Sequence, residues 1–557
     1  MRKLISRVTS LPSTTIIFTI LVAVSLLAVT SYFTLFATFN HNNIYVFAQQ
    51  PQQQPQQVSP ELIQKSREEA IQKFQTQFCG LNSKPNNNSY VTEYVLPQKC
   101  EMPLGILVNN DSVWYISSKH GTLGKFDIQT KKFKELTIPF WSTRSNPIDM
   151  SQSWDVEADP KGNIWFTDEK QNGIWKYEVD SGKFSFFLVP EVPKDFGTIY
   201  PVSMTFDEKG NVYFAGIRSQ SLWIGNITKL KNGTSDGISY VKLPIEGFKG
   251  TDPFLISTGS VQIDNKRNVL WVSMLAFGVK GEVFKYDISK GAITVYDLPS
   301  TLNSPVGIVL DENGNPWISD HGTSIFFMLN PSDGKITEFT TSPFSKRIAP
   351  EMPSNVRAYT LPYWIRIDSN NSFWFNEHIG NKIGKFDPKS GTLIEYWIPT
   401  QNPLWGMCQP PTKSACGIAN ALQFSIGKNN QLWFSEWTEN KLGMLNTTNP
   451  VPFEVNVAQD KITVKKGETK EIPITISANK DVNVRAIASS TITPTGGFGN
   501  ATTSFSQDSF SMTSGEDKTV SFLITPSEDI PPGEYTMMLG VEDDQVSYLK
   551  SLSLRII

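Results

Sequence analysis

Carboxylates and imidazoles recur at matching positions of a repeated sequence pattern. Each repeat starts from an aromatic anchor, and in three successive repeats the third residue beyond the anchor is Asp320, Glu377 or Glu436. In the first two of these repeats the next residue is His321 or His378. Converging carboxylates can hold a divalent cation, and an imidazole can remove a proton. The pattern therefore makes the three acids candidate ligands of a divalent cation, Mg²⁺ or Ca²⁺, and makes His378 and His321 candidates for a general base.

A simpler explanation exists for each of these residues. An acid at the end of a strand can keep a turn soluble, and a histidine in a turn can be an ordinary surface residue. However, the chain has four histidines, and three of them (His120, His321 and His378) fall in the same loop of different repeats. That coincidence favours a functional role for His321 and His378, whereas His120 lies two residues further along its repeat.

A second group of residues is expected to line the centre of the fold, where the innermost strand of each repeat begins. Tyr363, Trp364 and Arg366 belong to one repeat and Trp154 to another. Their aromatic rings could bind a substrate, and Arg366 could contact a substrate carbonyl. Alternatively, Arg366 pairs with an acid of a neighbouring repeat.

The element that must position these residues is a four-stranded repeat. Trp374-Phe-Asn-Glu-His-Ile-Gly-Asn-Lys-Ile-Gly reads as two short strands around a polar turn, and a third strand follows and ends at Pro399. Anchors recur about every 45 to 60 residues, a spacing typical of propeller blades. The anchors are Trp114, Trp165, Tyr213, Trp271, Trp317, Trp374 and Trp433. The sequence therefore predicts an all-β fold, a seven-bladed β-propeller over residues 90–450.

The segments before the propeller have other compositions. Residues 1–48 combine Arg2, Lys3 and Arg7 with an uncharged apolar run, which predicts a signal peptide cleaved after Ala48 or a retained membrane anchor. Residues 49–89 are a Gln/Pro-rich linker and a short helix from Ser59 to about Phe78. Residues 91–97 resemble an outer blade strand without its blade, and we expect them to complete the last blade.

The four cysteines fit an exported protein. Cys79 and Cys100 precede the first blade, and Cys408 and Cys416 bracket one loop. Loop closure favours the local disulfides Cys79–Cys100 and Cys408–Cys416 over the other two pairings. Free buried thiols are the alternative. The predicted location is extracellular, either secreted or anchored to the membrane by the N-terminal segment.

Residues 451–557 contain no tryptophan and alternate β-branched strands with turns such as Lys466-Gly467 and Pro531-Pro-Gly533. Their number and spacing predict an immunoglobulin-like β-sandwich. Over the whole chain of 557 residues the net charge is −3, and no nucleotide-binding loop or basic patch is visible. We therefore expect no nucleic-acid partner, and a protein that is a monomer.

The repeat W-F-x-E-x-x-x-N-x-I-G, followed by G-x-[IL]-x-E-[FY]-x-[IL]-P, resembles the streptogramin (virginiamycin B) lyase family over about residues 90–450. The resemblance implies seven blades and, in active members, Mg²⁺-dependent opening of a cyclic depsipeptide ester by elimination. It implies that Glu377 and Glu436 are metal ligands and that His378 or His321 is the base. The metal would polarise the ester carbonyl while the imidazole removes the α-proton.

Three functions remain open at this point. The first is a metal-dependent carbon–oxygen lyase acting on a cyclic ester. The second is a non-catalytic propeller that recognises a surface glycan or peptide. The third is a metal-dependent lactonase of the gluconolactonase type, although such enzymes have six blades. Substitution of His378 and His321 distinguishes catalysis from recognition.

Overall fold

A computed structural model describes residues 60–80, 84–143, 149–190, 200–345, 347–348, 358–407, 415–427 and 431–557. The predicted signal or anchor segment, residues 1–48, lies outside this range. Among the helices of the described range, none is long and apolar enough to cross a bilayer. The one α-helix described, α3 (Pro60–Phe78), falls where the sequence predicts a helix.

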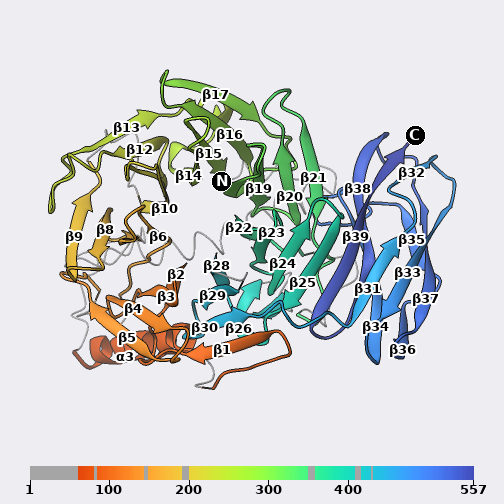
Figure 1. Cartoon of the computed structure of the whole chain (residues 1–557), viewed down its shortest axis with the longest axis horizontal. Helices are drawn as coiled ribbons and strands as arrows, with labels where there is room; N and C mark the ends of the chain where they lie inside the picture. Colours follow the sequence, from red (N-terminus) through yellow and green to blue (C-terminus); the bar gives the residue numbers. More distant parts are fainter. Residues whose placement is uncertain are drawn as a thin grey trace, which may run out of the picture.

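Seven blades of four antiparallel strands each surround a central channel, so the ring is a β-propeller (Figure 1). Six blades are separate four-stranded sheets, and the strands of blade 6 belong to a nine-stranded sheet. Blade 1 has β2 (Pro103–Asn109), β3 (Ser112–Ser117), β4 (Thr122–Asp127) and β5 (Phe133–Thr137). Blade 2 has β6 (Val156–Ala158), β7 (Ile164–Asp168), β8 (Gly173–Glu178) and β9 (Lys183–Leu188). Blade 3 has β10 (Tyr200–Phe206), β11 (Val212–Ile217), β12 (Ser221–Gly225) and β13 (Ile238–Lys242).

The ring continues in the same way. Blade 4 has β14 (Ile256–Asp264), β15 (Val269–Ala276), β16 (Lys280–Asp287) and β17 (Ala292–Asp297). Blade 5 has β18 (Pro305–Leu310), β19 (Pro316–Asp320), β20 (Ile325–Leu329) and β21 (Ile336–Thr340). Blade 6 has β22 (Pro362–Ile367), β23 (Phe373–Glu377), β24 (Lys382–Asp387) and β25 (Thr392–Trp397). The short 3₁₀ helices η2 (Glu246–Phe248) and η3 (Pro253–Leu255) precede blade 4.

Blade 7 joins the two ends of the propeller. It contains β28 (Ala421–Ile426), β29 (Leu432–Glu436) and β30 (Lys441–Leu445), and its outer strand is β1 (Val91–Val95). β1 pairs antiparallel with β30, from Val91 opposite Leu445 to Val95 opposite Lys441. The prediction that residues 91–97 complete the last blade is therefore confirmed. A hairpin of β26 (Asn402–Met407) and β27 (Ala415–Ile418) lies between blades 6 and 7.

The repeated glycine of the sequence pattern has a packing reason. Gly124, Gly384 and Gly443 each face an aromatic ring of the neighbouring strand. A Cβ on Gly443 would lie 2.1 Å from a Phe434 ring atom, far inside van der Waals contact. The glycine therefore leaves room for the aromatic ring of the neighbouring strand. Packing within the blade thus requires glycine at this position of the repeat.

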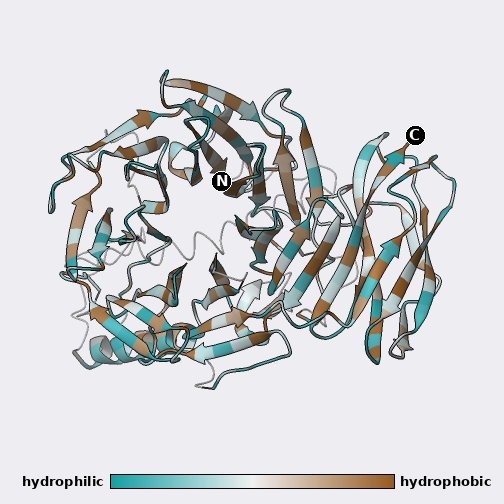
Figure 2. Cartoon of the chain, viewed as in Figure 1, coloured by the Kyte–Doolittle hydropathy of each residue, from teal (hydrophilic) through white to brown (hydrophobic). Residues whose placement is uncertain are grey.

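The C-terminal strands form two sheets. One is β31 (Phe453–Val457), β33 (Lys470–Ala478), β37 (Asp517–Thr525) and β35 (Thr502–Phe505). The other contains β32 (Lys461–Val464), β39 (Val546–Ile556), β38 (Gly533–Glu542), β34 (Val482–Ser490) and β36 (Ser509–Met512). Apolar residues of both sheets share one core, so this is a β-sandwich. Hydropathy alternates along its strands (Figure 2), as expected where one face is buried.

The sandwich is not a loosely attached module. β39 pairs antiparallel with β25, the outer strand of blade 6, from Thr392 opposite Lys550 to Tyr396 opposite Val546. The sheet of blade 6 thus continues directly into the sandwich (Figure 1). This pairing covers an outer strand that would otherwise be an open edge.

The disulfide Cys79–Cys100 is present, which confirms that predicted pairing and ties the end of α3 to the segment before blade 1. Cys416 is also disulfide-bonded. Its predicted partner, Cys408, lies outside the described residues.

Candidate functional site

His321 and His378 come together at one mouth of the propeller channel. His321 directly follows β19 of blade 5, and His378 directly follows β23 of blade 6. Backbone hydrogen bonds hold both turns: the His321 amide donates to the Ser304 carbonyl and the His378 amide to the Leu361 carbonyl. The rings are nearly parallel, with centroids 5.4 Å apart. His321 Nε2 lies 3.1 Å from His378 Nδ1.

The hydrogen bonds around the two rings set their tautomers. His378 Nε2 lies 2.6 Å from Asn420 Oδ1, and an amide oxygen can only accept. His378 Nε2 therefore carries the proton, and His378 Nδ1 accepts from His321 Nε2. In this arrangement His321 Nδ1 is the unprotonated nitrogen, and the described part of the chain provides it with no hydrogen-bond partner. The hydrogen-bonded series Asn420–His378–His321 therefore ends in a basic lone pair on His321 Nδ1.

Both imidazoles are neutral at ordinary pH. Burial, followed by the proximity of His378, lowers the pKa of His321 well below its usual value. Burial lowers the pKa of His378 to about 4, an effect that the Asn420 hydrogen bond partly opposes. Each side chain nevertheless keeps some solvent exposure. The two rings are thus neutral and partly exposed.

Aromatic side chains surround the imidazole pair. The Tyr363 ring meets the His321 ring edge-on with centroids 4.6 Å apart, and Phe277 lies on another side at 5.8 Å. Tyr363 and Trp154 also border an apolar cluster that includes Phe74 and Phe78 of α3. Helix α3 therefore helps to build this face of the propeller, a role that its sequence alone does not indicate.

Arg366 forms ion pairs with two acids of another blade. Its Nη2 atom lies 2.9 Å from Glu157 Oε1 and 3.8 Å from Asp155 Oδ1. Arg366 is on β22 of blade 6, whereas both acids are at β6 of blade 2, on the other side of the channel (Figure 1). Burial and the Glu157 carboxylate raise the pKa of Asp155 to about 7, although Arg366 opposes the shift. An ion-pair cluster therefore crosses the channel.

The other predicted substrate-binding residues have mixed environments. Trp154 Nε1 donates to Glu169 Oε2 at 3.0 Å and remains partly exposed. Trp364 is buried, and the Arg366 guanidinium lies 5.3 Å from its ring centroid. Tyr363 is the one in direct ring contact with the imidazole pair. Of the predicted set, Tyr363 and Trp154 are the two that remain partly exposed and border the same apolar cluster.

Glu377 is turned away from its neighbour His378 into the space between blades 5 and 6. It is 1% exposed, and neither of its oxygens receives a hydrogen bond from the described residues. Nearby, Lys382 Nζ contacts Glu395 Oε2 at 3.0 Å, and the Ser342 amide donates to Glu395 Oε1. Burial and the Glu395 carboxylate raise the pKa of Glu377 well above its usual value. This raised pKa favours the protonated form of Glu377.

Glu436 occupies the equivalent place between blades 6 and 7. Lys441 Nζ lies 2.7 Å from Glu93 Oε2 and 2.7 Å from Thr400 Oγ1. Burial and the Glu93 carboxylate raise the pKa of Glu436 well above its usual value. We call the two arrangements the inter-blade clusters: Glu377, Lys382, Glu395 with Ser342, and Glu436, Lys441, Glu93 with Thr400. Each holds a lysine, an acid paired with that lysine, and a second acid whose pKa is raised.

The structure does not bring the three predicted metal ligands together. Glu377 and Glu436 lie in separate inter-blade clusters, in which the lysines pair with Glu395 and Glu93. Asp320 accepts hydrogen bonds from the Ser304 and Gly322 amides at 2.9 Å each. Within the described ranges, no group of three or more His, Cys, Asp or Glu side chains is arranged to hold a metal ion. This set therefore does not fit Mg²⁺ or Ca²⁺, because the carboxylates point into different spaces.

Several residues of the site escaped the sequence analysis. Asn420 sits in a turn at φ +57° and lies outside the repeated pattern, so only the fold places it against His378. Lys382 and Lys441 did carry a signal, since each follows an Asn at the same distance from Glu377 or Glu436. Those asparagines, Asn381 and Asn440, adopt positive φ, and their side chains bind the chain that connects the blades.

Comparisons with known proteins show similarity at the level of structure. No protein-family profile matches the sequence, and no curated protein matches it. A streptogramin B lyase structure is 21% identical, covers 64% of this chain and 97% of its own, and has a TM-score of 0.47. Selenomethionine-substituted virginiamycin B lyase from Staphylococcus aureus is 20% identical, covering 64% and 98%, with a TM-score of 0.46. A catalytically inactive variant of that enzyme with quinupristin is 19% identical, covering 64% and 98%, with a TM-score of 0.47.

Proposed function

We propose that the channel mouth of this propeller binds a cyclic ester and opens it by elimination, with His321 as the general base. The observation that supports the proposal is the oriented pair of neutral imidazoles. Its hydrogen bonds leave His321 Nδ1 as an accessible lone pair next to the Tyr363 ring. A general base needs this combination of neutral charge and exposure.

The proposed step balances without another reactant. His321 Nδ1 takes the proton from the carbon α to an amide carbonyl of the substrate. The electron pair of that C–H bond forms a C=C bond to the adjacent carbon, and the C–O bond of the ester breaks there. The ester leaves as a carboxylate, so the ring opens without consuming water. The new imidazolium keeps its hydrogen bond to His378 Nδ1, which stabilises the charge.

Asn420 and His378 would act as positioning residues in this reaction. The Asn420 oxygen fixes the proton on His378 Nε2, and His378 in turn fixes the proton on His321 Nε2. Loss of Asn420 would permit the other tautomer of His378. Tyr363, Phe277 and Trp154 provide aromatic surface for the body of the substrate.

A non-catalytic recognition surface is the second candidate. Phe140 is 86% exposed and Phe254 is 57% exposed. Both lie in connections from the last strand of one blade to the first strand of the next, on the face that carries the histidines. Exposed rings near a channel mouth can bind a peptide or glycan directly. We further propose that the protein is exported, since disulfides persist outside the cytoplasm, and that its sandwich is immunoglobulin-like.

The test compares variants of the full-length protein on a streptogramin B depsipeptide and on simple lactones in H₂¹⁸O. Elimination yields an opened product with a new C=C bond and no ¹⁸O, whereas a lactonase incorporates one ¹⁸O. We expect His321→Ala to lower kcat at least 100-fold. Asn420→Ala should lower it less, while His120→Ala serves as the matched control. Binding without turnover, or an active His321→Ala variant, would overturn the proposal and favour recognition.

A further inference from the structure

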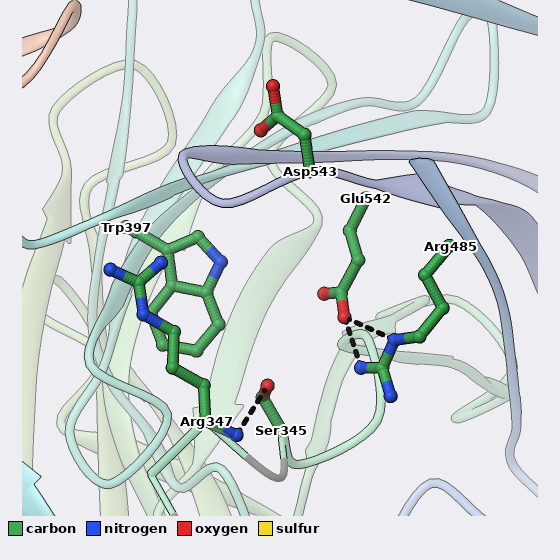
Figure 3. A pocket seen from close by; sticks show the side chains of 6 residues that line it. All are labelled: Ser345, Arg347, Trp397, Arg485, Glu542 and Asp543. Atoms are coloured by element: carbon green, nitrogen blue, oxygen red, sulfur yellow. Dashed lines mark hydrogen bonds and ion pairs between the residues drawn. The ribbon is translucent and has the colours of Figure 1, made fainter. Parts of the chain in front are cut away.

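A cavity of about 210 Å³ lies where the propeller meets the sandwich (Figure 3). The propeller contributes Ser345, Arg347 and Trp397, and the sandwich contributes the other lining residues, Arg485, Glu542 and Asp543. The β38–β39 turn forms one wall of the cavity. A hydrogen bond holds this turn against the propeller, since the Trp397 amide donates to the Gln545 carbonyl at 3.0 Å. This site is separate from the imidazole pair.

The indole nitrogen of Trp397 is the first sign of a ligand. Trp397 is 1% exposed, and its Nε1–H has no hydrogen-bond partner within the described ranges. Figure 3 shows this nitrogen on the edge of the ring that faces Glu542 across the cavity. A buried donor without an acceptor costs about 1–3 kcal/mol. An acceptor atom placed in the cavity would remove that cost.

The charge of Arg347 is the second sign. Its guanidinium lies 5.0 Å from the Trp397 ring centroid and donates to the Asp544 carbonyl oxygen. No carboxylate among the described residues lies within ion-pair distance of it. Arg347 therefore brings a positive charge and further N–H donors to the cavity, and no side chain described here compensates that charge.

The remaining lining groups are already engaged. Arg485 pairs with Glu542, and the hydroxyl of Ser547 donates to the other Glu542 oxygen at 3.4 Å. Asp543 accepts from the Gln545 and Val546 amides, and its carboxylate points away from Trp397 in Figure 3. The lining as a whole has no net charge, because Arg347 and Arg485 are matched by Glu542 and Asp543. What it offers to a ligand is the indole donor of Trp397 and the Arg347 guanidinium, which has no ion-pair partner among the described residues.

We propose that this junction cavity binds a small carboxylate. One carboxylate oxygen would accept from Trp397 Nε1, and the other would accept from the Arg347 guanidinium. A planar anion with two acceptor oxygens matches this pair of donors, because carboxylates bind arginine through directed N–H groups. The cavity is smaller than those that hold drug-sized ligands, so the ligand portion inside it is a few atoms beyond the carboxylate.

Such a carboxylate could belong to a free acid, an acidic sugar or the C-terminus of a peptide. The experiment therefore titrates the full-length protein by calorimetry with sodium succinate, sodium glucuronate and acetyl-triglycine. Glucose and sodium chloride are the negative controls. We expect saturable binding of at least one of the three carboxylates. The compound that binds best shows whether the natural ligand is a free acid, an acidic sugar or a peptide C-terminus.

Two variants make the test specific. Arg347 is exposed, so Arg347→Met should fold normally, and we expect it to weaken binding about tenfold or more because a charge-assisted hydrogen bond is lost. Trp397→Phe removes the indole donor and should also weaken binding. Arg555→Met, an exposed arginine elsewhere on the sandwich, should bind like the parent. Absence of binding, which would mean that water alone fills the cavity, or undiminished binding by Arg347→Met, would overturn the proposal.

Discussion

Glu377 and His378 are neighbours in sequence but belong to two different regions of the molecule. Glu377 lies in an inter-blade cluster, where Lys382 and Glu395 leave no net charge and water is excluded. His378 lies at the channel mouth, where its ring remains partly exposed and bonds to His321 and Asn420. Successive side chains near a strand end point to opposite sides, so one residue of the pair joins the packing and the other stays at the partly exposed channel mouth.

The difference shows that a buried carboxylate in a repeated motif does not by itself indicate chemistry. The same cluster is built twice, on Glu377 and on Glu436, with an equivalent lysine, outer-strand acid and hydroxyl. The imidazole pair occurs once, and its hydrogen-bond partner Asn420 is outside the motif. Repetition therefore points to blade packing, and the unrepeated contact is the better candidate for function.

The largest effect on stability is expected when an inter-blade cluster is broken. Lys382→Met removes the ammonium and leaves the Glu395 carboxylate buried without its counter-charge. We expect a loss of about 3–5 kcal/mol of stability, because one partner of a buried ion pair is removed. Scanning calorimetry measures the fall in Tm, and Lys389→Met, an exposed lysine of the following turn, is the control. Equal Tm values for the two variants would show that the cluster is not structural.

A smaller effect is expected at the other member of the same cluster. Glu377→Gln should lower stability by only about 1 kcal/mol or less, since the amide has the same shape and replaces an acid whose raised pKa favours its uncharged form. Glu395→Gln should cost several times more, because Lys382 then loses its counter-ion. Parallel urea titrations would compare the two variants. A larger loss for Glu377→Gln would mean that Glu377 is the charged acid.

The two regions should also respond to pH in opposite directions. The folded pKa of His378 is about 4 against 6.5 for an unperturbed histidine, so the unfolded state binds more protons between these values. This contribution to stability is complete above pH 6.5 and is lost as the pH falls toward 4. For Glu377 the pKa is raised, so its contribution is present at low pH and is lost as the pH rises through the raised pKa.

Thermal unfolding from pH 4 to 9 measures both slopes. His378→Gln should flatten the Tm profile on the acidic side, and Glu377→Gln should flatten it on the alkaline side. The effects are expected to be modest, because His378 keeps some exposure to solvent. Identical profiles for the parent and both variants would remove the electrostatic distinction between the two regions.

Much of the fold could be predicted because the repeat depends on contacts between residues that are close in sequence. Asp159 and Asp368 accept turn amides, and each also receives the indole N–H of its aromatic anchor, Trp165 or Trp374. These contacts join residues that are close in sequence, so each aspartate and its anchor tryptophan keep a recognisable spacing. The closing strand β1 was also predictable, because its apolar alternation matches an outer blade strand.

The metal site could not be predicted in the same way. Equivalent positions in successive blades suggested that Asp320, Glu377 and Glu436 converge, but each side chain enters its own local environment. Likewise, Arg366 was expected to contact a substrate or to pair with an acid of a neighbouring repeat, and it pairs across the channel with acids of blade 2. Neither outcome follows from spacing, since both depend on which way a side chain turns in a closed ring.

The sequence by itself determined the blades, the strand that closes the ring and the placement of histidines in equivalent loops. Those properties follow from strand alternation, turn chemistry and repeat length, all of which act over short stretches of chain. Only the tertiary structure decided that His321 and His378 touch, that Asn420 orients them, and that β39 extends blade 6 into the sandwich. These contacts join residues far apart in the chain, and ring closure brings them within hydrogen-bond distance.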